Sequence, residues 1–307
     1  MSLHERKAGP PSTAPGARER FKSLDPYRVD REWRRYEGTA QRDLFRELRV
    51  RFLRRHSVTG RWAVDVGSGP GRFLPHLGPS GAQRVALDLS LETLHRVESP
   101  GRSPPHLVRG DGTTPPFARA AFSNVAVLGN ALGFAGDDAD RFLEAAESLV
   151  APGGVLLLEV VAGPGERSRY LNRLPPRTLT RLLRSPVRAL QLRTLREGFV
   201  PEPPRRRESG QFTRFDPADL ATQFQSRGWE VREVVAVAPA LGASPAAIEA
   251  ARSDAKAWTH LLEMEEVIGR MPERWTSAAA VLLSFSAAYP PENARLSSPA
   301  PPFLGLT

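Results

Sequence analysis

The sequence has 307 residues, 40% of them hydrophobic, and a formal net charge of +9, which suits one large decorated domain with an anionic partner. It contains no cysteine, which excludes disulfides, thiolate zinc sites and cysteine nucleophiles, and the spacing of its six histidines indicates no metal site. No stretch approaches the roughly 20 apolar residues of a membrane span, and the polar start is unlike a signal peptide, so we expect a cytoplasmic protein without a transmembrane segment.

The two ends of the chain lack hydrophobic periodicity. Residues 1–24 are basic and residues 289–307 are proline-rich, so both are predicted to be disordered tails. Within 25–57, apolar residues recur at spacings near three and four, which predicts an N-terminal cap of one or two amphipathic helices. The apolar residues of this pattern are Trp33, Tyr36, Leu44, Leu48 and Phe52.

From Trp62 the chain alternates short apolar runs with helical stretches, a pattern typical of a parallel sheet covered on both faces. The strands predicted within the core, 60–161, are 62–66, 84–88, 106–109, 125–128 and 155–161. The helices predicted between them are a short one after Gly71, one capped by Ser90 that lasts to about residue 98, and one capped by Asp137 or Asp138. The elements predicted in 215–288 are a helix at 217–227, a strand at 230–237, a long helix at 245–270 and a strand at 279–285.

Residues 163–214 interrupt the alternation with 13 arginines against four glutamates, so this insert alone carries a net charge of +9. Leucines interleave with the arginines, which predicts an amphipathic helical lid that follows strand five. These leucines are Leu171, Leu174, Leu179, Leu182, Leu183 and Leu190. A nucleic acid, an anionic small molecule or an anionic membrane surface would each suit the charge, and so would solvent alone.

A glycine-rich turn directly follows the first predicted strand, with glycines at positions 67, 69 and 71. Glycines at such a turn let a ligand approach the main chain. Asp88 lies 21 residues after Gly67 at the next strand end, the spacing at which a carboxylate binds a ribose diol. A dinucleotide fingerprint would place its third glycine at position 72, which is arginine, so a cofactor without a pyrophosphate is favoured over a nicotinamide dinucleotide.

Together with Gly110-Asp111-Gly112 after the third strand, this pattern resembles the class I S-adenosylmethionine-dependent methyltransferase family over about residues 60–161. The resemblance implies an α/β fold with a doubly wound, mostly parallel seven-stranded sheet, helices on both faces and an antiparallel last strand. S-adenosylmethionine would lie across the carboxyl ends of the strands. The cofactor-binding residues implied are Asp65, Gly67, Gly69, Gly71, Asp88, Leu89, Asp111, Gly112 and Asn130.

The resemblance also implies a role for most of these residues. Asp65 and Gly67 would line the methionine end, and Asp88 would hold the ribose. Leu89 would flank the adenine, the Asp111 carboxylate and the Gly112 amide would contact its edge, and Asn130 would border the transferred methyl. Each motif also has a structural alternative: a tight strand-to-helix turn for the glycines, a helix cap for Asp88 and a turn into Gly112 for Asp111.

The methyl acceptor is less clear from the sequence. Methyl transfer from a sulfonium depends on alignment and exclusion of water, so no catalytic residue is assigned. The segment 129–134 departs from the Asn/Asp-Pro-Pro-aromatic motif of amine-methylating relatives, which disfavours that chemistry. Candidate acceptor contacts are Trp33, Tyr36, Asn130, Phe134 and Glu159, of which Glu159 could equally be a solvated or ion-paired strand residue.

A small-molecule acceptor is the leading prediction, and three alternatives stay open. They are an RNA (tRNA or rRNA) methyltransferase, a non-catalytic cofactor-binding subunit of a partner protein, and a nicotinamide oxidoreductase. The sequence does not determine the oligomeric state.

Overall fold

A computed structural model describes most of the central part of the chain. The described residues are 38–97, 104–163, 165–185, 187–201, 213–238, 240, 245–276 and 278–287. The predicted tails, 1–24 and 289–307, lie outside these ranges, as do Trp33 and Tyr36.

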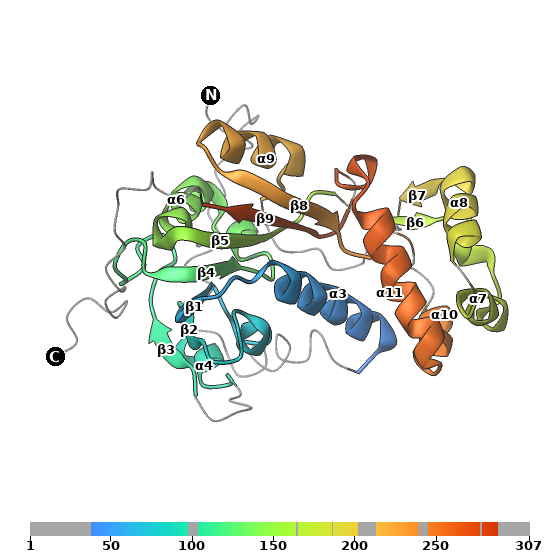
Figure 1. The fold of residues 1–307 in the computed structure, drawn as a ribbon, viewed down its shortest axis with the longest axis horizontal. Helices are drawn as coiled ribbons and strands as arrows, with labels where there is room; N and C mark the ends of the chain where they lie inside the picture. The colour runs from blue at the N-terminus through green and yellow to red at the C-terminus, as the bar shows by residue number, and fades with distance from the viewer. Residues whose placement is uncertain are drawn as a thin grey trace, which may run out of the picture.

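Seven strands form one sheet in the order β3-β2-β1-β4-β5-β9-β8 (Figure 1). Strands β1 to β5 are parallel, whereas β9 runs antiparallel to both β5 and β8, which confirms the predicted fold class. The strands are β1 (Trp62–Val66), β2 (Gln83–Asp88), β3 (His106–Arg109), β4 (Phe122–Val127), β5 (Val150–Val160), β8 (Glu230–Ala236) and β9 (Val281–Ser286). The order reverses between β1 and β4, so a crevice is expected at the carboxyl ends of these two strands.

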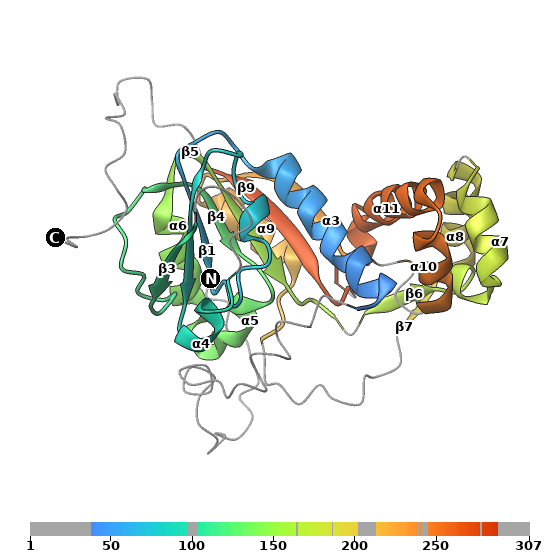
Figure 2. The same cartoon turned by 90° about the horizontal axis from the view of Figure 1, so that it is seen from below.

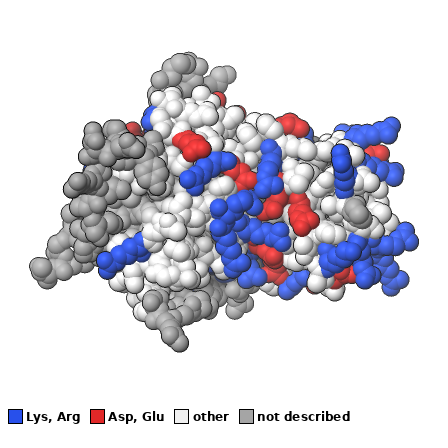
Figure 3. All heavy atoms as spheres, viewed as in Figure 1, with Lys and Arg blue, Asp and Glu red and all other residues white. Residues whose placement is uncertain are grey.

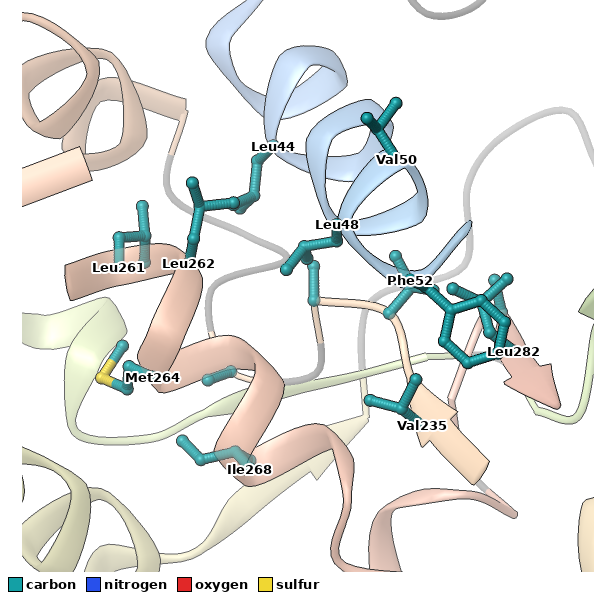
Figure 4. Packing of buried hydrophobic residues seen from close by; sticks show 14 of the residues in the cluster. Leu44, Leu48, Val50, Phe52, Val235, Leu261, Leu262, Met264, Ile268 and Leu282 are labelled. Carbon is teal, nitrogen blue, oxygen red and sulfur yellow. The ribbon is translucent and has the colours of Figure 1, made fainter. Parts of the chain in front are cut away.

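Helices cover both faces of the sheet, because alternate strand residues are buried on opposite sides. One face carries α3 (Ala40–His56), with α11 (Ala255–Gly269) beyond it, and the other carries α6 (Ala139–Leu149) and α9 (Pro217–Ser226). Figure 2 shows α3 and α6 on opposite sides of the sheet. The predicted amphipathic pattern is confirmed in α3, whose Leu44, Leu48 and Phe52 point toward α11 and the sheet (Figure 4).

Two predicted helices are shorter than expected. After Gly71 the chain forms only a 3-10 turn, η2 (Leu74–His76), which contains a proline at position 75 and is soon followed by Gly78. Ser90 does cap a helix, since its Oγ accepts a hydrogen bond from the Thr93 amide at 3.2 Å, but this helix, α4, spans only Leu91–Leu94. Helix α4 ends early because the amides of Arg96 and Val97 bond to carbonyls three residues earlier, which is the tighter 3-10 pattern.

The prediction of one long helix over 245–270 is wrong. The chain forms α10 (Pro245–Arg252) and α11 instead, and Asp254 lies at the break. Its Oδ1 accepts hydrogen bonds from the amides of Lys256 and Ala257, so the carboxylate starts a new helix where the hydrophobic period alone suggested continuation.

The insert contains the predicted amphipathic helices and also an unpredicted strand pair. Strand β6 (Glu166–Ser168) pairs antiparallel with β7 (Phe199–Pro201), and between them lie η4 (Leu171–Arg173), α7 (Pro176–Leu183) and α8 (Arg188–Glu197). Helix α7 packs on α10 and α11 and buries Leu179 and Leu183. The opposite side keeps its arginines exposed, and Figure 3 shows Lys and Arg gathered over the end of the molecule that holds α7 and α8.

The remaining helical segments are α5 (Ala131–Phe134), η3 (Gly136–Asp138) and η5 (Pro272–Arg274). Asp138 occupies the residue before α6, as predicted, but without a side-chain capping hydrogen bond. In the part of the chain that the structure describes, no helix is both long and apolar enough to cross a membrane.

Candidate functional site

The glycine turn after β1 has an open side. Gly67, Gly69 and Gly71 have φ of +75°, +52° and +69°, a region that side chains rarely adopt. A Cβ on Gly67 would lie 2.6 Å from the Ala131 Cβ, whereas a Cβ on Gly69 would meet nothing within 4 Å. The turn is therefore packed against α5 at its first glycine and leaves space at its second.

Asp88 ties this turn to the end of β2. Its Oδ2 accepts a hydrogen bond from the Gly69 amide at 2.8 Å, and its Oδ1 accepts one from the Ser90 amide at 2.9 Å. Burial raises the pKa of Asp88, and the hydrogen bonds from Ser90 and Gly69 oppose this rise. Asp88 thus lies beside the glycine turn and also contributes to the start of α4, as the capping alternative expected.

Asp65 is the least satisfied carboxylate in this region. It is buried at the end of β1, and its Oδ1 has no hydrogen-bond partner among the described residues. Burial raises the pKa of Asp65 to about 7, and the negative charges of Asp88 and Glu159 add to that effect. A buried anion without a partner is costly, so a cationic ligand group at this position would relieve a real penalty.

Asn130 follows β4 in the left-handed conformation, which few residue types other than glycine and asparagine adopt readily. Its φ is +67°, directly after Gly129 at +64°. Its Oδ1 is buried and has no partner in the described part of the chain. A Cβ on Gly133 would approach this oxygen to 2.2 Å, so a glycine is required there. A left-handed asparagine costs little, because its short polar side chain tolerates this conformation.

The third strand end forms the turn that the structural alternative predicted. Asp111 Oδ1 accepts hydrogen bonds from the amide and the hydroxyl of Thr113, both at 2.9 Å. A Cβ on Gly112 would lie 2.3 Å from the Phe142 ring. The backbone carbonyl of Leu89 accepts a 3.3 Å hydrogen bond from Arg109 Nε.

The sheet brings all the predicted cofactor residues together. They lie at or just after the carboxyl ends of four adjacent parallel strands, β3, β2, β1 and β4. Gly67 and Ser68 also donate amide hydrogen bonds to the Leu87 carbonyl, which joins the first two strand ends directly. The result is a row of glycine turns with carboxylates at the topological crevice of the sheet.

Glu159 has the ion-paired role that the sequence left open. It is buried in β5, and its carboxylate forms a double contact with Arg49 of α3 and accepts a hydrogen bond from Gly129. Sequence reasoning missed Arg49. The signal was present, because Arg49 lies four residues after Phe45 and three before Phe52, on the apolar side of its helix.

The other acceptor candidates are less well placed by the structure. Phe134 is half-buried at the end of α5, four residues after Asn130. Trp33 and Tyr36 remain hypotheses, because they lie outside the described residues. Among the residues that are described, no group of three or more histidine, aspartate or glutamate side chains could hold a metal ion.

Comparison with known families identifies the stretch of chain that forms these turns. Residues 64–158, which contain every predicted cofactor residue, match the family model of a methyltransferase domain. This chain carries a class I methyltransferase domain. The cofactor of the methyltransferase domain is S-adenosylmethionine.

Several solved structures resemble the methyltransferase chain at low identity. One is the Haloferax volcanii methyltransferase in complex with the Trm112 methyltransferase activator, 19% identical, with 85% of this chain and 96% of that chain covered and a TM-score of 0.49. Magnesium protoporphyrin IX methyltransferase from Synechocystis PCC 6803 with bound SAH is 13% identical, with coverages of 88% and 98% and a TM-score of 0.49. A Mesorhizobium loti S-adenosylmethionine-dependent methyltransferase is 17% identical, with coverages of 81% and 98% and a TM-score of 0.41. No curated protein matches the sequence.

Proposed function

We propose that this methyltransferase domain is catalytically active and transfers a methyl group from S-adenosylmethionine to a small-molecule acceptor. The observation that carries the proposal is the buried, unpartnered Oδ1 of Asp65 near the open turn at Gly69. A polar atom in that state fits a ligand with a positive group, and the amino acid end of S-adenosylmethionine carries an ammonium.

The other residues of the crevice suit the rest of the cofactor. Asp88 would accept hydrogen bonds from the ribose diol while it keeps its bond to Gly69. Asp111 and Gly112 would contact the edge of the adenine, and Leu89 would cover one of its faces. Each residue lies at a strand end that the sheet already aligns, so binding requires little rearrangement of the backbone.

The chemistry requires alignment more than proton transfer. When bound, S-adenosylmethionine supplies a methyl group activated by its positive sulfur. The chain has to hold the acceptor in line with that methyl and exclude water, and Asn130, in its fixed left-handed turn, would border the reacting groups. No residue is assigned as a catalytic base.

The insert supports an enclosed acceptor. Where it ends, the Thr213 amide donates a 2.8 Å hydrogen bond to the Gly133 carbonyl, three residues after Asn130. The Phe215 amide then bonds the Val161 carbonyl at 3.0 Å, at the end of β5. The insert therefore returns to the sheet close to the turn of Asn130, and on our proposal a lid over a small acceptor would close there.

The RNA alternative is favoured by one specific observation. Arg173, Arg177 and Arg181 are exposed at four-residue intervals along η4 and α7, away from the buried leucines. Such a stripe could contact phosphates. A further basic run, Arg205 to Arg207, lies outside the described residues. If RNA were the acceptor, glutamine at these last three arginines would flatten the dependence of log affinity on log salt by roughly two to three units.

The test of the proposed function combines binding with turnover. Protein purified at low salt is analysed by mass spectrometry for co-bound S-adenosylmethionine or its demethylated product. It is then incubated with methyl-labelled S-adenosylmethionine and either a small-molecule extract or total RNA. Our proposal predicts label in the small-molecule fraction, strongly reduced by Asp65→Asn and unchanged by Asp219→Asn, a change of an exposed acid in α9.

Three other outcomes would replace the proposal. Label in RNA would make the protein an RNA methyltransferase. Cofactor binding without any transfer would favour a non-catalytic subunit. No affinity for S-adenosylmethionine would remove the function altogether.

A further inference from the structure

A buried ion pair connects the N-terminal helix to the floor of the crevice. Arg49 Nε lies 2.8 Å from Glu159 Oε2, and Arg49 Nη2 lies 2.6 Å from Glu159 Oε1. Both side chains are about 95% buried, with exposed fractions of 5% and 4%. The third guanidinium nitrogen, Nη1, donates to the Phe45 carbonyl at 2.9 Å within α3. The guanidinium is thus fixed on one side by its own helix and on the other by β5.

The same carboxylate also contacts the turn that would border the transferred methyl. Glu159 Oε2 accepts a 3.1 Å hydrogen bond from the Gly129 amide. Gly129 and Asn130 both have positive φ, so two consecutive left-handed residues form this turn, and the bond from Gly129 ties the turn to β5. The chain from Arg49 through Glu159 to Gly129 therefore consists of short polar contacts in a buried region, where each contact counts strongly.

Charge gives the pair a second effect. Glu159 is one of the anions whose field acts on Asp65, together with Asp88. Without the guanidinium of Arg49, the carboxylates of Asp65, Asp88 and Glu159 would all act on the position proposed for the ligand ammonium. At least one of them would then take up a proton. Arg49 pairs with Glu159 from helix α3 and offsets its charge, which favours an ionised Asp65.

We propose that Arg49 is a positioning residue of the cofactor site, which acts through Glu159 to hold the Gly129–Asn130 turn and to keep Asp65 ready for a cationic ligand group. This inference rests on the proposed function, because the site must bind S-adenosylmethionine for the effect to be measured. It assigns helix α3 a role in binding although α3 lies outside residues 64–158 of the family match.

The test compares two arginines on the same helix. Arg49→Met and Arg55→Met each remove one cation of α3 that is paired with a glutamate. Arg49 pairs with Glu159 on β5, beside the proposed site, whereas Arg55 pairs with Glu233 on β8. Calorimetric titration with S-adenosylhomocysteine at pH 7.5 is expected to show at least tenfold weaker binding for Arg49→Met. Arg55→Met is expected to lower the thermal midpoint while binding as the wild type does. A folded Arg49→Met protein with wild-type affinity would overturn the inference.

A second variant keeps the inference testable if Arg49→Met does not fold. Glu159→Gln retains an oxygen for the Gly129 amide but removes the negative charge near Asp65. The pH at which cofactor affinity begins to fall is expected to move down by at least half a unit in this variant, whereas a merely structural role would leave it unchanged. If cofactor affinity begins to fall at the same pH in Glu159→Gln as in the wild type, the inference is contradicted. A wild type that binds no cofactor would instead contradict the proposed function.

Discussion

Asp88 accepts a 2.8 Å hydrogen bond from the amide of Gly69, so the acid at the end of β2 fixes the open glycine of the turn after β1. The bond joins the two motifs that the sequence suggested separately. It also means that Asp88 has a structural task besides any contact with a ribose, because its other oxygen holds the start of α4.

Asp88→Ala is therefore expected to change both binding and stability. Losing charge-assisted hydrogen bonds to the ribose would weaken binding of S-adenosylmethionine about ten- to a hundredfold, and losing the bonds from Gly69 and Ser90 would cost about 1–3 kcal/mol of unfolding free energy. Calorimetric titration and urea unfolding measure the two effects. Asp219→Ala, at an exposed position of α9, serves as the control and is expected to change neither. Unchanged affinity in a folded Asp88→Ala protein would exclude Asp88 from the site.

The glycine turn permits a matched comparison of two alanine substitutions. Gly69 and Gly228 both have positive φ and both have open space where a Cβ would lie, but Gly228 follows α9 at a distant turn. Each substitution is expected to cost about 1 kcal/mol of stability, because alanine disfavours this backbone conformation. Only Gly69→Ala is expected to weaken S-adenosylmethionine binding, by fluorescence or calorimetric titration. Equal affinities for the two variants would show that no ligand approaches Gly69.

The raised pKa of Asp65 predicts that cofactor affinity depends on pH. With the pKa of Asp65 near 7 in the free protein, the carboxylate must lose its proton to pair with the ligand ammonium. Affinity is therefore expected to be nearly constant above pH 8 and about tenfold lower at pH 6. Asp65→Asn should bind about ten- to a hundredfold more weakly at pH 8 and show little change down to pH 6. Titration with S-adenosylhomocysteine at several pH values measures this, and a flat wild-type profile would contradict it.

The raised pKa of Asp65 also predicts that Asp65→Asn stabilises the ligand-free protein. The pKa of Asp65 is raised in the folded state from 3.8 to about 7, so its contribution to stability is lost as the pH rises through this range. Asparagine cannot ionise and avoids that loss. Asp65→Asn is expected to raise the unfolding free energy by about 1–3 kcal/mol at pH 8 and much less at pH 5. A variant that is less stable than the wild type at pH 8 would show that Asp65 has an unrecognised partner.

Much of this architecture was predictable from the sequence because parallel strands buried on both faces read as short apolar runs. The predicted cofactor motifs could be located because Gly67, Asp88 and Asp111 each lie at or just after the end of such a run. What failed depends on local chemistry that a hydrophobic period does not record. Asp254 splits a predicted helix by capping a new one. The Arg49–Glu159 pair joins residues 110 positions apart, and nothing local in the sequence indicates which buried charges meet.

A cluster of charged side chains around Glu233 predicts that the fold is sensitive to acid. Glu233 of β8 accepts contacts from Arg270 at 2.6 Å, His56 at 2.5 Å and Arg55 at 2.9 Å. Burial alone would raise the pKa of Glu233, but the hydrogen bonds from His56 and Arg270 and the charge of Arg55 lower it from 4.5 to about 2. This depressed pKa contributes stability above pH 4.5 that is lost as the pH falls toward 2.

Glu233→Gln is expected to reduce the unfolding free energy by about 1–2 kcal/mol at neutral pH. The difference from the wild type should stay constant down to about pH 5 and shrink below pH 4.5. Urea unfolding followed by circular dichroism over this pH range gives the comparison. A difference that grows on acidification would show that Glu233 is not held in its ionised form by this cluster.

We expect the crevice at the ends of β3, β2, β1 and β4 to bind S-adenosylmethionine, and titration calorimetry on the 307-residue protein measures this binding. Parallel titrations with S-adenosylmethionine, S-adenosylhomocysteine and NAD use the same preparation at pH 8. We predict saturable binding of the first two ligands to a single site per chain, strong weakening in Asp65→Asn, and no binding of NAD. Saturable binding of NAD, or wild-type affinity for S-adenosylmethionine in Asp65→Asn, would contradict an S-adenosylmethionine site at this crevice.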